Sequence, residues 1–216
     1  MPTLLHLDSS ADTEVSRSRA ITRAFADEWR AQGPDFTVVY RDLHRDPLPH
    51  IPAAALHWPE RLRPEGSVVP ADAEALQAEV INELLAADVL LVGAPLYNYS
   101  VPSSLKAWID HIHVPGVTAP FDVDTQPLAG RAAVIATSRG GSYDAGSATA
   151  DWDHAVPVLE LILGTALGME TSVITTSLTL AETVPALAED LERSRTEFAE
   201  ALTAAAASAR SIASGF

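Results

Sequence analysis

Short apolar runs and longer amphipathic stretches alternate along this chain. Each run is bounded by turn residues, which is typical of strands buried on both faces of a parallel sheet. The runs predict five strands, which cover Thr3 to Asp8, Phe36 to Tyr40, Asp88 to Pro95, Arg131 to Thr137 and Glu170 to Thr175. Between the runs, apolar residues recur three and four positions apart, as they do on one face of a helix.

These apolar stripes predict a helix in each interval and one at the end of the chain. They consist of Ile21, Phe25 and Trp29; Leu76, Val80 and Leu84; Leu105, Trp108, Ile109 and Ile112; Val158, Leu161, Ile162 and Thr165; and Leu187, Leu191, Phe198 and Leu202. Right-handed crossovers place successive strands in one layer with helices on both faces. We therefore expect one flavodoxin-like α/β domain over residues 1–216, with a doubly wound five-stranded parallel sheet in the order 2-1-3-4-5.

Composition narrows the function. A chain of 216 residues with 47% hydrophobic content is long enough for one domain that buries about 70% of its unfolded surface. The chain has 29 acidic and 14 basic residues. The resulting net charge of −15 opposes binding to nucleic acid or to anionic membranes. The absence of cysteine excludes thiolate chemistry. With no basic leader at the start and no run of membrane-spanning length, we expect a soluble, cytoplasmic protein.

Hydroxyl groups gather where the first predicted strand leads into the first helix. Ser9 and Ser10 stand at the end of the first strand, Ser16 is the predicted N-cap, and Ser18 lies in the first helical turn. The positive end of a helix favours a phosphate, and Arg17 and Arg19 add charge. On this segment alone, ordinary helix capping explains the serines better than a phosphate site does, and the two further motifs described below reverse that preference. The segment lacks a GxGxxG motif, which argues against a tightly bound dinucleotide and favours a mononucleotide such as FMN.

Two further loops are expected at the same edge of the sheet, where the strands end and ligands bind in open α/β folds. The first offers aromatic faces and an amide, and the second offers backbone N–H groups beside two glycines. The residues are Pro95, Leu96, Tyr97, Asn98 and Tyr99 in the first loop and Ser138, Arg139, Gly140 and Gly141 in the second. For the second loop, a simple turn after a strand is the alternative interpretation.

Three segments in order resemble the FMN-dependent NADH azoreductase and NAD(P)H:quinone reductase family. They read LDSSADTEVSRSRA, DVLLVGAPLYNYSVPSSLKAWID and ATSRGGSY, and the resemblance extends over almost the whole chain. It implies an oxidoreductase that binds FMN, takes electrons from NADH or NADPH, and reduces quinones and azo compounds by ping-pong two-electron transfer. It also implies a homodimer with flavin sites at the subunit boundary and no strict need for a protein acid or base.

The same resemblance assigns roles to the three loops. Ser10, Ser16, Arg17 and Ser18 would hold the phosphate, Pro95 to Tyr99 would frame the ribityl chain and ring, and Ser138 to Gly141 would contact the pyrimidine edge. The chain departs from the family at two points. Many members carry Phe where Tyr99 stands, and many carry another residue where Arg17 stands.

Two long connections without a helical or strand pattern stand out. The segment from His44 to Pro70 holds six of the fifteen prolines, which prevents continuous helix or sheet pairing. In the resembling family this region reaches over a dimer partner near its flavin, so Trp58 and Arg61 are candidates there. The second connection runs from Val114 to Gly130, where Phe121 is a candidate to cover the ring. Surface loops without a function are the alternative.

Other functions fit this sequence less well. A flavodoxin-like one-electron carrier suits the acidity, but the first loop lacks the Thr/Ser-Gly-Thr-rich signature of such carriers. A flavin-free hydrolase is disfavoured because His154, beside Asp153, has no GxSxG nucleophile to serve. His111 and His113 fall on different helix faces, which disfavours a shared metal. Tyr143 faces either substrate or solvent.

Overall fold

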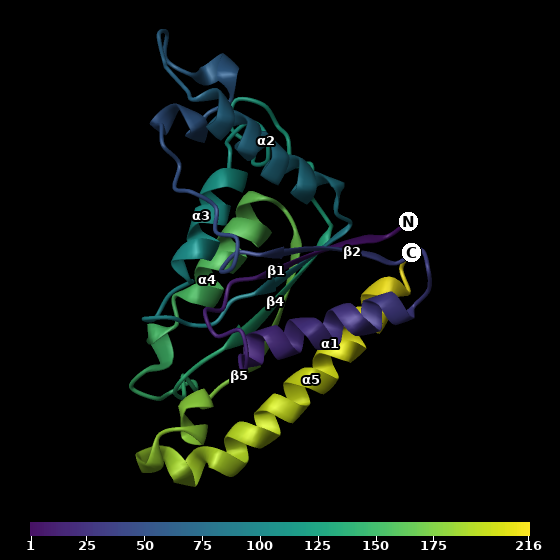
Figure 1. The fold of residues 1–216 in the computed structure, drawn as a ribbon, viewed down its shortest axis with the longest axis vertical. Coiled ribbons are helices and arrows are strands. Elements are labelled where there is room, and N and C mark those ends of the chain that lie inside the picture. The colour runs from purple at the N-terminus through teal and green to yellow at the C-terminus, as the bar shows by residue number, and fades with distance from the viewer.

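The computed structural model describes residues 1–216 and contains one five-stranded parallel sheet in the order β2-β1-β3-β4-β5 (Figure 1). The predicted fold and strand order are therefore confirmed. The strands are β1 (Thr3–Asp8), β2 (Thr37–Asp42), β3 (Val89–Gly93), β4 (Ala132–Ser138) and β5 (Glu170–Thr176). Because the chain returns from β2 to the far side of β1, the strand order reverses between β1 and β3. A crevice forms at such a switch point.

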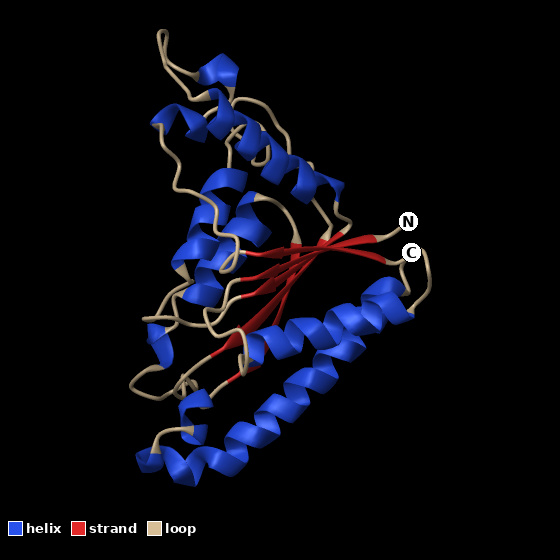
Figure 2. Cartoon of the chain, viewed as in Figure 1, coloured by secondary structure: helices blue, strands red, loops and turns tan.

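Helices cover both faces of the sheet (Figure 2). The α-helices are α1 (Arg17–Ala31), α2 (Ala71–Ala86), α3 (Ser103–Ile112), α4 (Ala155–Leu159) and α5 (Leu191–Ala213). A π-helical segment, η4 (Glu160–Ala166), continues α4. Short 3-10 turns are η1 (Ala54–His57), η2 (Glu60–Leu62), η3 (Ala150–Trp152), η5 (Thr179–Glu182) and η6 (Pro185–Asp190). No helix is both long enough and apolar enough to cross a bilayer.

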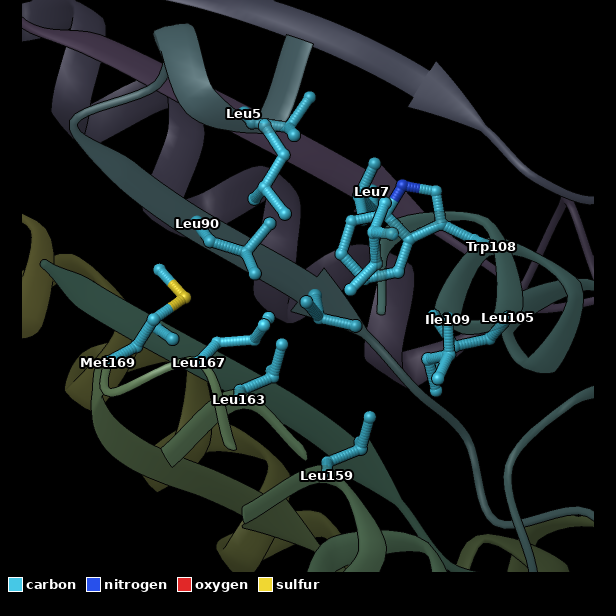
Figure 3. Packing of buried hydrophobic residues seen from close by; sticks show 14 of the residues in the cluster. Leu5, Leu7, Leu90, Leu105, Trp108, Ile109, Leu159, Leu163, Leu167 and Met169 are labelled. Carbon is cyan, nitrogen blue, oxygen red and sulfur yellow. The ribbon is translucent and has the colours of Figure 1, made fainter. Parts of the chain in front are cut away.

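The two faces of the sheet have different cores. Side chains alternate along each strand, so Leu5 and Leu7 enter one core and Leu4 enters the other. The first core contains the indole of Trp108 and large aliphatic residues from α2, α3 and α4 (Figure 3). The second contains aromatic residues of α1 beside small residues of α5. Packing on both faces holds the strand ends, and hence the loops that follow them, in fixed positions.

The apolar stripes predicted for the last two helices are wrong in part. In α4 and η4, Leu161 is 59% exposed, and the buried residues are Ala155, Leu159, Leu163 and Leu167, four positions apart. A π-helical segment, with its i to i+5 bonds, carries more residues per turn than an α-helix and so shifts the buried face. Leu187 lies in η6, before α5 begins.

The buried stripe of α5 consists of small residues. They are Ser194, Ala201, Ala205, Ala209 and Ala213. Small side chains let α5 approach α1 closely, while Phe198 and Leu202 pack at the margin of the same core.

The two long connections dock on each other. The guanidinium of Arg61 donates to Asp122 (2.7 Å) and to the carbonyl oxygen of Gly116 (3.0 Å). The rings of Trp58 and Phe121 meet edge to face, with centroids 5.2 Å apart. We call residues 44–70 and 114–130 together the arm, which lies at the top of Figure 1 beside α2. His111, whose Nε2 lies 3.0 Å from the carbonyl oxygen of Pro49, tethers the arm to α3.

Candidate functional site

The three predicted loops meet at one edge of the sheet. They follow β1, β3 and β4, which are neighbours in the sheet. The loop after β3 is fastened to the end of β4, since the N–H of Ala94 donates to Ala136 (2.9 Å) and that of Leu96 donates to Ser138 (2.8 Å). The edge is therefore one continuous surface.

A cavity of about 280 Å3 opens between these loops at the switch point. Six of the predicted site residues line it, namely Ser10, Ser16, Arg17, Pro95, Tyr97 and Ser138. The opposite wall includes Thr179, Glu182 and Thr183, which sequence reasoning missed. These residues follow β5. The sequence could have pointed to them, because the fifth parallel strand must end at the same edge of the sheet as the others.

Free donors gather at the start of α1. The Oγ of Ser16 accepts from the N–H of Arg19 (3.4 Å) and lies 3.1 Å from the Oγ of Ser18. The backbone N–H groups of Ser16, Arg17 and Ser18 have no acceptor within the chain. Such a helix N-terminus, with unpaired N–H groups and adjacent hydroxyls, suits a phosphate.

The side chain of Arg17 is held by the C-terminal part of the chain. Its guanidinium donates to the carbonyl oxygen of Ser194 (2.9 Å), lies 3.4 Å from Glu182, and stands 5.0 Å above the ring of Phe198. Burial lowers the pKa of Arg17, and the charge of Glu182 opposes that effect. Arg17 therefore lines the cavity as a partner of α5 and not as an unpaired cation.

A strained turn forms the rim between the β3 end and α3. Tyr97 and Ser100 exchange two backbone hydrogen bonds of 3.0 Å. The residues between them, Asn98 and Tyr99, have φ angles of +47° and +69°. Asn tolerates the left-handed region, but a tyrosine there is an outlier, and such strain is concentrated at functional sites.

The strained turn is supported from the α4 side. The ring of Tyr99 packs edge to face on Trp152, with centroids 5.4 Å apart, and its carbonyl oxygen accepts from the N–H of His154 (2.9 Å). The side chains of Tyr97 and Tyr99 nevertheless stay exposed at the rim. They are available to a flat ligand.

The loop after β1, which we call the phosphate loop, is hydrogen-bonded directly to the rim. The Oη of Tyr97 lies 3.1 Å from the Oγ of Ser10 and accepts from the N–H of Ala11 (3.1 Å). A ligand that contacts both segments therefore meets one connected surface.

The loop after β4 presents unpaired N–H groups. The carbonyl oxygens of Gly140 and Gly141 accept from Leu180 and Leu178 (3.2 Å each), whereas the N–H groups of both glycines have no acceptor in the chain. A Cβ on Gly140 would lie 3.0 Å from Leu180, while the space around Gly141 is open. Gly140 thus packs closely against Leu180 of η5.

Arg139 faces away from the cavity. Its guanidinium pairs with the buried Asp153 at 2.6 Å and lies over the ring of Tyr143 at 5.8 Å. Asp153 also accepts from the N–H of Ala155 (2.8 Å), at the start of α4. Burial raises the pKa of Tyr143, with the negative groups around it adding to the effect. The ion pair fixes the loop that carries Trp152.

A larger hollow of about 680 Å3 lies on the other side of Tyr97 and Asn98. Its walls come from the strained turn, the first half of α3 and the start of α4, together with His50 of the arm. A flat ligand on the rim would therefore have the small cavity at one end and this open hollow beside it.

The residues present fit FMN. The unpaired N–H groups of α1 suit its phosphate, the rim of Tyr97 to Tyr99 suits its ring, and the N–H groups of Gly140 and Gly141 suit the polar pyrimidine edge. Fold and site together define a flavodoxin-like protein with a mononucleotide site at the carboxyl edge of its sheet.

Comparison with known proteins agrees with this class. A family model for the flavodoxin-like fold matches residues 2–210. An FMN-dependent NADH:quinone oxidoreductase of Kineococcus radiotolerans is 58% identical over 212 residues, covering 98% of this chain and 100% of the relative. One of Frankia casuarinae is 41% identical over 207 residues, covering 95% and 97%. The chain belongs to this family of flavodoxin-like proteins.

Solved structures share the fold. An azoreductase of Bacillus anthracis superposes with a TM-score of 0.80 at 20% identity, covering 97% of this chain and 99% of the other. An FMN-dependent NADH-azoreductase of the same species, solved in complex with FMN, gives a TM-score of 0.76 at 19% identity and covers 97% and 100%.

Proposed function

We propose that this chain is an FMN-dependent NADH:quinone oxidoreductase that also reduces azo compounds. The observation that carries the proposal is the meeting of unpaired N–H groups, a strained aromatic rim and a glycine loop along one edge of the sheet. Two relatives with the name FMN-dependent NADH:quinone oxidoreductase, which match 98% and 95% of the chain, support it.

The residues divide the work along that edge. The N–H groups and hydroxyls of Ser16 and Ser18, with the Oγ of Ser10, hold the phosphate. Pro95, Leu96, Tyr97, Asn98 and Tyr99 support the ribityl chain and the ring. Glu182 neutralises Arg17 and holds it against α5, so phosphate binding rests mainly on N–H and hydroxyl donors.

FMN, when bound, accepts two electrons from NADH or NADPH and passes them to a quinone or an azo compound in a ping-pong sequence. The unpaired N–H groups of Gly140 and Gly141 would donate to the pyrimidine edge of bound FMN and would stabilise negative charge there. The open hollow beside Asn98 admits donor and acceptor in turn. Overall, one NADH, one proton and one quinone would give one NAD+ and one hydroquinone, with the proton taken from solvent.

We further propose a cytoplasmic homodimer. Phe121 of the arm is 64% exposed and Leu161 of η4 is 59% exposed, and large apolar side chains left in water at an open site favour a covering partner. In the proposed dimer the arm of one subunit covers the ring of the other and completes the hollow. A cytoplasmic location supplies the reduced nicotinamide.

Anaerobic stopped-flow of the FMN-loaded protein tests the proposal. NADH is expected to bleach the flavin absorbance, and a quinone added afterwards is expected to restore it at a rate that depends on its concentration. A one-electron carrier is the second candidate, favoured by the charge of −15. That candidate is correct if NADH leaves the absorbance unchanged while a protein reductant bleaches it.

A further inference from the structure

A buried arginine lies behind the phosphate loop, on the side away from the cavity. Arg19 is 7% exposed. Its guanidinium forms a bidentate pair with Asp42 at the end of β2, at 2.7 and 2.8 Å. Its Nε and Nη2 also donate to the carbonyl oxygen of Ser10, at 3.2 and 2.8 Å. One planar group therefore ties the end of β2 to the loop after β1.

The same guanidinium compensates two buried carboxylates. Asp8 and Asp42 lie 3.5 and 2.7 Å from Arg19, and their side chains are at most 9% exposed. Asp8 also accepts from Thr22 (2.9 Å) and from the hydroxyl of Tyr40 (3.1 Å). Because removal of one partner from a buried ionic group leaves uncompensated charge, the guanidinium has a fixed position.

That position sets the orientation of one peptide group. The carbonyl of Ser10 and the N–H of Ala11 belong to the same planar trans peptide, so they point in opposite directions. Arg19 holds the carbonyl inward, and the N–H of Ala11 consequently points outward to the Oη of Tyr97 (3.1 Å). The Oγ of Ser10 lies beside the same hydroxyl (3.1 Å). A single peptide group thus links the guanidinium of Arg19 to the rim.

We infer that Arg19 is a positioning residue for the phosphate end of the flavin, which sets FMN affinity through Ser10 without touching the phosphate. The inference rests on the proposed function. Arginine is required because only its rigid fork can serve the carboxylate and the carbonyl together, whereas lysine is a point charge. A purely structural role for Arg19 is the competing explanation.

Riboflavin separates the two explanations, since it carries the ring and ribityl chain of FMN without the phosphate. The experiment measures the Kd of FMN and of riboflavin by quenching of flavin fluorescence in the parent, R19K, R19Q and D42N. The matched control is R23Q. Arg23 is an exposed residue one turn further along α1 that forms no ion pair within the chain.

We expect R19K to raise the Kd of FMN about 10-fold and that of riboflavin less than 2-fold, with a larger change in R19Q and a smaller one in D42N. At saturating FMN, the kcat of R19K for NADH oxidation should equal that of the parent. R23Q should change neither Kd. R19K keeps a cation between the carboxylates, so it remains informative if R19Q does not fold.

The inference is overturned if R19K weakens both flavins in parallel, which would show a structural role, or if it weakens neither. Failure of the proposed function looks different, because the parent itself would then not bind FMN. An R23Q variant that behaved like R19K would also overturn the inference, since it would show a general effect of charge.

Discussion

The phosphate end and the ring end of the site are built in opposite ways. At the phosphate end, the loop after β1 is held by the buried Arg19, by the cap at Ser16 and by the hydroxyl of Tyr97. At the ring end, Tyr99 and Trp152 are exposed, as is Phe121 on the arm, and the hollow beside Tyr97 and Asn98 is open. This difference fits the proposed dimer, in which one chain would hold the cofactor and a second subunit would complete the substrate pocket. Variants at the two ends should therefore affect different measured quantities.

The largest effect is expected from Ser16→Ala at the phosphate end. This change removes an N-cap and a hydroxyl that the phosphate would use. A hydrogen bond to a charged group is worth about 1.5–3 kcal/mol, so the Kd of FMN should rise roughly 10- to 100-fold. The measurement is flavin titration, with the exposed Ser211→Ala on α5 as the control. An unchanged Kd for Ser16→Ala would show that the phosphate does not bind at this helix end.

Loss of the cap should also lower stability. Replacing an N-cap serine with alanine lowers the free energy of unfolding by about 1 kcal/mol, which corresponds to roughly 2–4 °C in Tm for a domain of this size. The same measurement without FMN separates this effect from the loss of ligand.

A smaller effect is expected at Asn98, where the strained turn joins the two ends. Asn98→Ala should raise the Kd of FMN about 5-fold through loss of the amide, since a neutral hydrogen bond contributes about 1 kcal/mol. It should also lower stability by about 1–2 kcal/mol, because alanine does not favour a left-handed backbone. The matched variant Asn98→Gly keeps the turn and removes only the amide. If Asn98→Ala binds FMN as well as the parent, the assigned role of the amide is wrong.

At the ring end, Phe121→Ala should leave the Kd of FMN unchanged and raise the KM for a quinone about 3- to 5-fold. The reason is that the exposed ring would supply apolar contact to the substrate across the dimer, at about 25 cal/mol per Å2 buried. Steady-state kinetics at saturating FMN provide the measurement. Val68→Ala, another exposed apolar position of the arm, is the control. Loss of FMN from Phe121→Ala would mean that the two ends are not separable.

The smallest effect concerns acid stability at the phosphate end. Burial alone would raise the pKa of Asp42, but hydrogen bonds from Arg19 and from the N–H groups of Arg45 and His44 outweigh burial and hold that pKa well below its usual value. A carboxylate with a depressed pKa stabilises the fold above its unfolded pKa, which is about 3.9. That contribution is lost as the pH falls below about 4 towards the folded pKa.

Asp42→Asn should therefore lose less stability than the parent as the pH falls below 4, although it is less stable at pH 7. Thermal melts across this range give the comparison. Parallel loss of Tm in both proteins would show that Asp42 does not contribute to the acid sensitivity.

Most of the fold could be predicted because its signals are local. The run from Thr3 to Asp8 is apolar and short, and the observed β1 has the same bounds. The π-helical η4 could not be predicted, because no local sequence signal distinguishes its hydrogen-bond spacing from that of an α-helix; its buried residue Leu163 is in the core with strand residues far along the chain. The same holds for α5, whose closest contacts with α1 use alanines that no search for large apolar residues would select.

The candidate site, like the fold, has parts that could be predicted from the sequence and parts that could not. Three loops could be placed at one edge because parallel strands share a direction. The position of the Arg17 side chain could not be predicted, because it depends on a hydrogen bond to Ser194, 177 residues further along the chain. The role of Arg19 depends on Asp42 and on a backbone carbonyl, and neither contact has a local sequence signal. Docking of the two long connections through Arg61 and Asp122 is likewise a tertiary contact.

A crystal structure of the protein with FMN tests the central claim most directly. The account predicts the phosphate within hydrogen-bond distance of the N–H groups of Ser16, Arg17 and Ser18, with the ring beside the turn of Tyr97 to Tyr99. Another cavity lies between α1 and β2, where Arg23 and Arg45 contribute to its walls. A phosphate bound in that cavity, with the Ser16 helix end empty, would contradict the account.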